Sequence, residues 1–349
     1  MVRFIFKKLL YGLLVMLGVI VLVFFLFQGF GDPTRLVMGQ TGDKTTQENI
    51  RRELNLDQPK WKQFVLYIND VSPIGFHTRA EIEKKDLKGF FIGGDQTIGL
   101  KLPYLRKSYQ TKKSVSEVLL EALPGTLILA FAAMLIAVLI GIPLGVLAAV
   151  KQNTWVDTTA VFSSIVGISA PSFFMGIIIA YLFGFVWSDW TGLHITGSWF
   201  DIDVNTGERR LTLQNLVLPA FTLGIRPLAI ITQLTRSAML DVLDQDYIRT
   251  AYAKGLRKRA VIWKHGLRNA LNPVITAVTG WFAELLAGAF FIEYIFGWKG
   301  IGKVTVDALE KLDFPVVMGS VLISATIFIL VNIIADILYG IVDPRVRVR

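Results

Sequence analysis

Residues 123–150 read LPGTLILAFAAMLIAVLIGIPLGVLAAV, a run of 28 residues without one charged side chain. A helix needs about 20 predominantly apolar residues to cross the hydrocarbon core of a bilayer. A soluble core helix is apolar on one face only, and this run is apolar on all sides. The stretch therefore predicts a membrane-spanning helix and decides the class of the fold.

Five further stretches have the same character. They are Leu9–Phe30, Thr158–Trp187, Leu216–Thr235, Pro273–Phe296 and Phe314–Ala335. The whole chain is 53% apolar and 18% charged, against about 25% charged in soluble domains. This composition excludes a disordered chain, a small disulfide scaffold and an ordinary soluble enzyme. We expect an all-α polytopic membrane protein with six transmembrane helices. The first run is longer than the roughly 7–15 residues of a signal peptide, so we expect it to be retained.

The basic residues indicate the topology. The net charge is +9, and the segment Arg236–Asn272 alone carries eight basic residues against three acidic ones. The segment Ser188–Asn215 has two basic and four acidic residues. Because short cytoplasmic loops are enriched in Lys and Arg, both chain ends and the 236–272 loop are expected in the cytoplasm. This distribution accounts for the basic excess, so we expect no nucleic-acid partner.

Four regions follow from this topology. Residues 1–30 form the cytoplasmic N-terminus and first span, and 31–122 form a long extracytoplasmic loop. Residues 123–341 form the transmembrane core with the cytoplasmic 236–272 loop, and 342–349 form a basic cytoplasmic tail. A loop this long needs structure of its own. Thr45 and Glu48 are spaced as a capping box, and Pro59 is suited to open a second helix with Trp61, Phe64, Val65 and Ile68 on one face.

Enzymatic constellations are missing from the sequence. There is no cysteine, and the three histidines lie in three different segments, so neither a thiol nucleophile nor a histidine metal cluster is indicated. The stretch Gly297–Lys303 fits the spacing of a phosphate-binding loop. However, Val304 stands where magnesium binding needs Ser or Thr, and a membrane span precedes the motif instead of a strand. We therefore predict that this motif binds no nucleotide and that this chain is not an enzyme.

Two opposite charges lie near the middle of predicted spans. Arg226 is the eleventh of 20 residues in the fourth span, and Glu284 is the twelfth of 24 in the fifth. A charge at the bilayer centre costs about 2.5–3.5 kcal/mol on insertion scales, so such groups face the bundle interior and pair. We predict that Arg226 and Glu284 pair, either as a structural bridge or along a shared polar pathway. Glu293 lies near the outer end of its span and is expected to face elsewhere.

The 236–272 loop is longer than a connector needs. It contains DYIRTAYAKGL over residues 246–256, a helical pattern that ends at Gly255, followed by a basic helical stretch over Lys258–Leu271. Small side chains at Ala251, Ala253 and Gly255 would permit close docking against a partner. An amphipathic helix resting on anionic membrane lipid is the alternative, because basic residues favour that too.

These residues resemble a known family. Residues 246–256, followed by HGLRNALNPV over 265–274, are similar to the EAA-type coupling loop of binding-protein-dependent ABC importers. The chain resembles the permease subunits of the dipeptide, oligopeptide and nickel group, specifically the member of each pair with the long first loop. Further matching stretches are Leu54–Pro59, Leu123–Leu127, Gly141–Val146, Ala170–Phe174, Leu218–Ala220, Leu234–Ser237 and Asp343–Arg345.

The resemblance implies a permease of type I ABC importer architecture in a bacterial inner membrane. Its partners would be a second homologous permease, two cytoplasmic ATPase subunits and an extracytoplasmic substrate-binding protein. ATP and magnesium would bind to the ATPase subunits, and no cofactor to this chain. Because Gly297–Lys303 matches the family's outer segment after the fifth span, the resemblance also implies that its glycines serve turns and packing. The coupling residues carried over are Asp246, Tyr247, Arg249, Thr250, Ala251, Ala253, Lys254, Gly255 and Leu256. Peptides are the implied substrate; nickel, glutathione or a peptide-like antibiotic are alternatives.

The sequence departs from the family pattern in two regions. The first loop is longer than usual across His77–Lys101, and Arg226 and Glu284 stand where mainly uncharged residues are expected. The general motif has an acidic residue six positions before its glycine, and here that position is Arg249, as in the peptide subgroup. Export permeases, ATP-independent transporters, membrane enzymes and structural scaffolds are the competing classes. The transporter classes predict no separate binding protein, and a membrane enzyme predicts a catalytic constellation, which the sequence lacks. A scaffold would leave the Gly255-centred loop and the mid-span charges unexplained.

Overall fold

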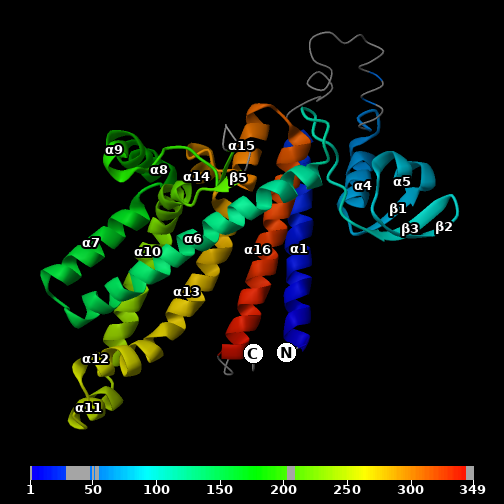
Figure 1. The fold of residues 1–349 in the computed structure, drawn as a ribbon. Helices are drawn as coiled ribbons and strands as arrows, with labels where there is room; N and C mark the ends of the chain where they lie inside the picture. The colour runs from blue at the N-terminus through cyan, green and yellow to red at the C-terminus, as the bar shows by residue number, and fades with distance from the viewer. Residues whose placement is uncertain (1, 29–47, 49–50, 52–54, 203–208, 343–349) are drawn as a thin grey trace. The chain divides into compact units, whose positions relative to one another are not determined.

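The computed structural model describes residues 2–28, 48, 51, 55–202 and 209–342. Thr45 and most of the helix predicted after it lie outside the described residues, so the predicted capping box is not tested. Contacts divide the chain into two units. One contains mainly Pro124–Lys303 and the last part of the C-terminal helix. The other contains Phe6–Leu123 and Val304–Thr326. Each unit is described separately below (Figure 1).

Most of the chain is helical. In chain order, the first part comprises α1 (Val2–Gln28), α4 (Lys60–Val71), β1 (Ile74–Thr78), α5 (Arg79–Lys85), β2 (Gly89–Gly93) and β3 (Gln96–Lys101). It continues with α6 (Val115–Val150), α7 (Trp155–Ser169), α8 (Ser172–Tyr181), the π-helical η1 (Leu182–Val186), α9 (Ser188–Thr191), β4 (Phe200–Ile202), β5 (Arg209–Leu211) and α10 (Gln214–Leu243). The last part comprises α11 (Asp246–Ala253), α12 (Lys258–Ala260), the π-helical η2 (Val261–Gly266), α13 (Leu267–Gly288), α14 (Phe290–Ile295), α15 (Ile301–Glu310) and α16 (Phe314–Val342).

The long apolar helices agree with the predicted class. Among the described residues, four are long and apolar enough to cross a membrane: Phe6–Leu26, Val115–Val150, Gln214–Leu243 and Phe314–Ile337. A fifth span is present if α7 and α8–η1 together count as one bent span. The remaining predicted span corresponds to α13 and α14, which are not among these helices. Polar residues such as Asn272 and Thr276 make it less apolar.

The predicted span Thr158–Trp187 is not one continuous helix. The chain bends by 108° between Ser169 and Ser172. Ala170 has φ −73° and ψ 130°, an extended conformation, and Pro171 directly precedes α8. Proline lacks an N–H donor and restricts the residue before it to extended geometry, which explains the break. Pro143 and Pro219, by contrast, lie inside continuous helices.

Helix α10 is central to the larger unit, because it packs against α7, α8 and α13. Small residues let α6 and α10 approach closely. A Cβ at Gly145 would lie 2.6 Å from the Thr232 carbonyl oxygen, and one at Gly224 would lie 2.8 Å from that of Ala133. Such close backbone approach is typical of packed membrane helices, where shape fit replaces the hydrophobic effect.

The second unit contains a small mixed domain, which we call the first-loop domain (α4, β1, α5, β2, β3). Its three antiparallel strands have the order β1-β3-β2. Thr78 and Glu81 form a capping box at the start of α5. The predicted second helix is present as α4, but Pro59 is its N-cap residue and not its first residue. The prediction of which residues form its apolar face was wrong in part. Trp61 and Val65 are exposed, while Tyr67, Asp70 and Val71 are buried.

Two sets of contacts hold the first-loop domain within its unit. The ring of Phe24 in α1 lies 5.0 Å from that of Phe64 and 5.7 Å from that of Tyr67. Past β3, in the segment that leads from the domain to α6, Asp313 accepts hydrogen bonds from the Ser108 hydroxyl at 2.5 Å and from the Tyr109 backbone N–H at 2.9 Å. The domain is thereby attached to α1, and the segment after it to the turn before α16.

Candidate functional site: the 236–272 loop and the helices beside it

The 236–272 loop forms a compact helical unit between α10 and α13. Helix α10 continues past the predicted end of its span to Leu243, and α11 follows after two residues. The predicted second basic helix begins at Lys258 as α12 and passes through the π-helical η2 directly into α13. In Figure 1, α11 and α12 lie together at one end of the helices α10 and α13. The predicted helix–glycine–helix arrangement is therefore present.

One face of α11 is fixed to the rest of the loop. Ile248 and Ala251 are buried and form an apolar cluster with Val261 of η2, against which Val242 and Leu243 also pack. Ala251 was expected to allow close docking of a partner, but its small side chain instead allows α11 to approach η2. The Tyr247 hydroxyl accepts a hydrogen bond from the Asn269 amide at 3.0 Å, which ties α11 to α13.

The opposite face of α11 is open to solvent. Tyr252 and Leu256 are 43% and 40% exposed, and Arg249, Ala253 and Lys254 are exposed as well. Arg249 lies 3.6 Å from Asp246 on the same surface, and Thr250 Oγ1 donates to the Asp246 carbonyl oxygen. Aromatic and aliphatic side chains among positive charges make a surface suited to a protein partner.

Gly255 ends α11 with a defined backbone geometry. Its φ is +77°, in the left-handed region that glycine adopts without strain. The Leu256 N–H donates to the Ala251 carbonyl oxygen, and the Gly255 N–H donates to that of Tyr252. These two bonds form a Schellman motif, which closes the helix end. A Cβ at Gly255 would meet no atom within 4 Å. The glycine is therefore required by conformation and not by crowding within this chain.

Arg226 and Glu284 are not joined in an ion pair. Both side chains are exposed, and in the described part of the chain no salt bridge connects them. The Arg226 guanidinium lies over the Trp281 ring, 5.4 Å from its centroid. Because Trp281 precedes Glu284 by three residues, the two charges still lie on neighbouring helical faces. The predicted direct bridge is thus absent, whereas a shared polar pathway remains a prediction.

Glu293 has a defined partner set within its unit. The side chain is fully buried, and its carboxylate accepts from the Thr126 hydroxyl at 2.7 Å and from the Lys303 backbone N–H at 3.1 Å. The Gly302 N–H also donates to it. The carboxylate therefore caps the N-terminus of α15, where backbone donors favour an anion. A Cβ at Gly300 would come within 2.4 Å of this carboxylate.

This contact explains the phosphate-loop spacing of residues 297–303. Gly300 and Gly302 do lie beside an anion at a helix N-terminus, but the anion is the carboxylate of the chain's own Glu293. Trp298 adds a hydrogen bond from its indole N–H to the Gly125 carbonyl oxygen at 2.9 Å. The prediction that these glycines serve turns and packing is confirmed for Gly297, with φ +62°, and for Gly300.

An ion pair between Asp157 and Arg236 was not anticipated from the sequence. Arg236 donates two hydrogen bonds to the Asp157 carboxylate, from Nε at 2.5 Å and from Nη2 at 2.7 Å. Asp157 is buried and also accepts from the Asn153 backbone N–H at 3.0 Å. Bidentate pairs of this kind fix orientation as well as distance. The pair joins the start of α7 to the part of α10 that enters the 236–272 loop.

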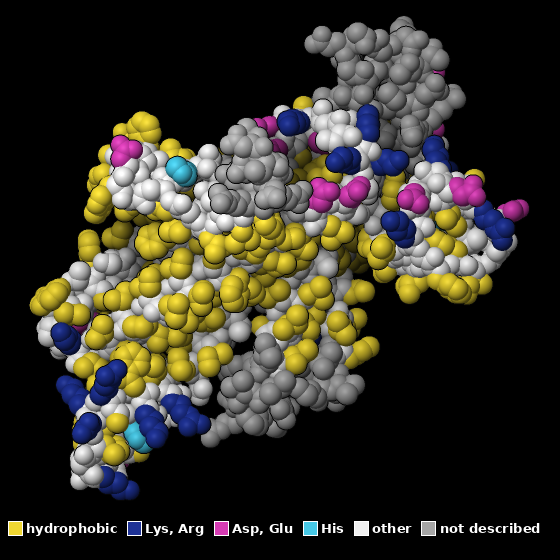
Figure 2. Space-filling view, viewed as in Figure 1, with side chains coloured by type: hydrophobic (Ala, Val, Ile, Leu, Met, Phe, Trp, Pro, Cys, Tyr) yellow, Lys and Arg dark blue, Asp and Glu magenta, His cyan; other side chains and the backbone are white. Residues whose placement is uncertain are grey.

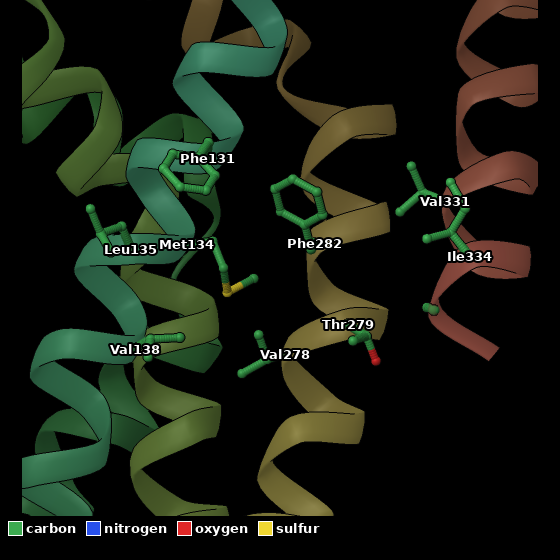
Figure 3. A pocket seen from close by; sticks show the side chains of 10 residues that line it. Phe131, Met134, Leu135, Val138, Val278, Thr279, Phe282, Val331 and Ile334 are labelled. Carbon is green, nitrogen blue, oxygen red and sulfur yellow. The ribbon is translucent and has the colours of Figure 1, made fainter. Parts of the chain in front are cut away.

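An apolar groove of about 420 Å³ lies between α6, α13 and α16. Figure 3 shows Met134 of α6 pointing toward α13 and Phe282 of α13 pointing toward α6, with Val331 and Ile334 on the other side. Thr279 is the one polar side chain that lines it. Among the described residues that line it, the groove is thus almost wholly apolar.

Comparisons with known proteins agree with the resemblance. The curated relatives include the dipeptide transport system permease protein DppB of Escherichia coli strain K12, 37% identical over 99% of both chains. The probable D,D-dipeptide transport system permease protein DdpB of the same strain is 38% identical over 95% of this chain and 94% of its own. The oligopeptide transport system permease protein AppB of Bacillus subtilis is 34% identical over 99% and 100%, respectively.

The similarity to a solved structure is weaker than the similarity to these curated relatives. A chain of the MetNI methionine ABC transporter, in an inward-facing conformation, aligns with a TM-score of 0.48 at 15% identity, covering 65% of this chain and 97% of that chain. Family models cover nearly the entire sequence. Residues 141–348 match the binding-protein-dependent transport system inner membrane component, and residues 1–130 match the N-terminal part of such membrane components. The chain belongs to the family of inner-membrane components of binding-protein-dependent transport systems.

Proposed function

We propose that this chain is the permease subunit of an ATP-driven importer and forms half of a pore for di- or oligopeptides. The observation that carries this proposal is the full-length similarity to permeases named for dipeptide and oligopeptide transport. Nickel, glutathione or a peptide-like antibiotic as substrate are the alternatives within the same group. An ATP-independent transporter is a less favoured alternative. The chain is a multi-pass inner-membrane protein, and we infer that both of its ends lie in the cytoplasm.

The solute path is proposed to run along the exposed polar face of α10 and α13. Arg226 and Gln233 lie on α10, and Thr276, Gly280 and Glu284 lie at helical spacing on α13. On α6 and α7 of the same unit, many exposed side chains are large and apolar, for example Phe131, Leu139 and Phe162. Charges at mid-span are costly in lipid, whereas water or a polar solute can solvate them. A second homologous permease facing this surface would complete the pore.

The 236–272 loop is proposed to dock on a cytoplasmic ATPase subunit. The exposed face with Arg249, Tyr252, Lys254 and Leu256 would enter the partner, while Ile248 and Ala251 hold α11 rigidly to its own chain. A rigid docking helix can pass on the closure of the ATPase, and the spans would then alternate between outward and inward access. ATP and magnesium would bind to the two ATPase subunits, and this chain would neither bind a cofactor nor catalyse a reaction.

The first experiment tests the assembly. The tagged chain is extracted from its native membrane in mild detergent, and the co-purifying proteins are identified by mass spectrometry. We expect a second permease and ATPase subunits. Gly255→Pro should weaken the ATPase band, because proline cannot adopt φ +77°. Gly94→Pro is the matched control, since Gly94 is exposed and a Cβ there would meet no atom within 4 Å.

The second experiment tests transport. The purified complex and its binding protein are reconstituted in liposomes, and uptake of a radiolabelled dipeptide is measured with and without ATP. Uptake that requires ATP supports the proposal. A chain that purifies without ATPase in several detergents, or peptide uptake that is independent of ATP, would favour the ATP-independent alternative.

A further inference from the structure

The sheet of the first-loop domain has its polar side chains on the covered face. His77, Thr97 and Lys101 are buried on the side where α4 and α5 contact β1. Thr97 Oγ1 donates to the His77 carbonyl oxygen at 2.7 Å, and the Lys101 ammonium donates to the Asp70 and Ser72 carbonyl oxygens. A domain surrounded by water normally covers its apolar face and leaves the polar one open.

The opposite face is apolar and uncovered. Pairing between strands arranges its side chains in two rows: Ile74, Leu100 and Phe90, then Phe76, Ile98 and Ile92. These six side chains are between 47% and 72% exposed. Single exposed apolar side chains are common on soluble proteins, but two contiguous rows of them mark an interaction surface. We call this surface the apolar sheet face.

The position of the domain within its unit points to the bilayer as the occupant. Phe64 and Tyr67 of α4 pack on Phe24, two residues before the end of the apolar stretch Phe6–Leu26 of α1. Helix α4 in turn contacts β1. The sheet therefore lies about one helix diameter, roughly 10 Å, from the end of a membrane span. In Figure 1 the strands lie on the side of the domain toward the N-terminal half of α1, and α5 lies on the opposite side.

The composition of the face also favours lipid over a protein partner. Its six side chains are Phe, Ile and Leu, without a polar group among them. Protein interfaces carry about one hydrogen bond per 100–200 Å² and surround their apolar core with a polar rim, and the aromatic residues enriched there include Tyr and Trp as well as Phe. Elements that lie in the membrane interface combine an apolar face with a strongly charged opposite one. Figure 2 shows this division, with hydrophobic side chains on the lower side of the domain and most of its charged side chains above them.

We propose that the apolar sheet face is inserted into the lipid leaflet at the C-terminal end of α1, which is the outer leaflet in the proposed topology. The first-loop domain would then be anchored twice, by Phe24 of α1 and by the bilayer. The anchoring does not depend on which solute is transported.

The test uses the absence of cysteine from the chain. Single cysteines are introduced by Phe90→Cys and Ile98→Cys on the apolar sheet face and by Glu83→Cys on exposed α5 as the control. Each is labelled with bimane in the full transporter and reconstituted in vesicles of phosphatidylethanolamine and phosphatidylglycerol, with or without 5-doxyl lipid. We expect loss of most bimane fluorescence at positions 90 and 98 in the doxyl vesicles, and an unchanged signal at position 83.

Two results would overturn the proposal. Equal, weak quenching at all three positions, with reaction of 90 and 98 toward a membrane-impermeant maleimide, would place the face in water. Protection from the maleimide without quenching would mean that protein covers it. A second variant, Phe76→Asp, should reduce quenching at position 98, whereas Glu83→Lys should not. Failure of ATP-dependent uptake would disprove the proposed function while leaving the quenching result unaffected.

Discussion

Replacing Glu293 should test whether its carboxylate organises the segment between α14 and α15. The side chain is fully buried and accepts hydrogen bonds from the Thr126 hydroxyl and from the backbone N–H groups of Gly302 and Lys303. In Glu293→Ala all three buried donors lose this acceptor. Each such loss costs about 1–3 kcal/mol, so the free energy of unfolding should fall by roughly 3–9 kcal/mol.

Glu293→Gln should be much milder. The amide oxygen can accept from the two backbone N–H groups, and the amide nitrogen can donate to Thr126 Oγ1, which already accepts from the Ile301 N–H at 2.9 Å. We expect a loss of about 1–2 kcal/mol, corresponding to the weaker neutral hydrogen bonds. Glu284→Ala is the control of the same residue type, because the Glu284 side chain is exposed.

The assay is thermal stability of the tagged chain in detergent, followed by size-exclusion chromatography with fluorescence detection. At about 1–2 °C per kcal/mol for a chain of this length, Glu293→Ala should lower Tm by roughly 5–12 °C. Gly300→Ala should also be destabilising, because its Cβ would lie within 2.4 Å of the carboxylate. The double variant should lose less than the sum, since removing Glu293 makes room. If Glu293→Ala has no more effect than Glu284→Ala, the capping argument fails.

Three further predictions concern other charged groups. Asp157→Ala and Arg236→Ala should each destabilise the chain, and the double variant should lose about 1–3 kcal/mol less than their sum in the same thermal assay; additive losses would mean that the bidentate pair contributes nothing. Arg226→Gln and Glu284→Gln should each reduce peptide uptake, and the logarithms of their effects should add because the two charges are not paired; a double variant no worse than the worse single one would restore the direct bridge. Burial, together with Lys85 and Lys101, lowers the pKa of His77 in the folded chain despite the opposing effect of Asp70 and Glu81. Below about pH 6.5 the unfolded chain therefore binds more protons than the folded chain, and the free energy of unfolding should decrease as the pH is lowered. His77→Gln should flatten that fall between pH 8 and 5, and an unchanged slope would contradict the assignment.

Features encoded by nearby residues could be predicted from the sequence. The apolar runs, the helix ending at Gly255 and the basic helix after Lys258 each depend on a short window with a clear pattern. The break at Pro171 could not be predicted in the same way, because Pro143 and Pro219 occur in equally apolar runs and stay within continuous helices. The outcome depends on whether neighbouring helices satisfy the freed backbone groups, and this is a property of the packing.

Contacts over long sequence distances were missed for a related reason. Thr126 and Glu293 are 167 residues apart, and Asp157 and Arg236 are 79 apart. No local spacing joins either pair. The sheet of the first-loop domain was missed because its strands are short and contain several glycines. Its alternating pattern also places the apolar residues on the open face. Arg226 and Glu284 were placed correctly on neighbouring helices, but side-chain direction at mid-span was not determined by spacing alone.

The position of the 236–272 loop links the proposed docking surface to the proposed solute path. Helix α10 is continuous from Arg226 to Leu243, a length of about 26 Å, and Leu243 packs directly on the cluster that holds α11. On the other side, Val261 of that cluster belongs to η2, which continues into α13 and so to Glu284. A displacement of α11 by a partner therefore acts on both helices that carry the mid-span charges. The Asp157–Arg236 pair extends the same displacement to α7. Because packed helices move as rigid elements between discrete arrangements, this connection gives docking at α11 a direct physical route to the polar face of α10 and α13.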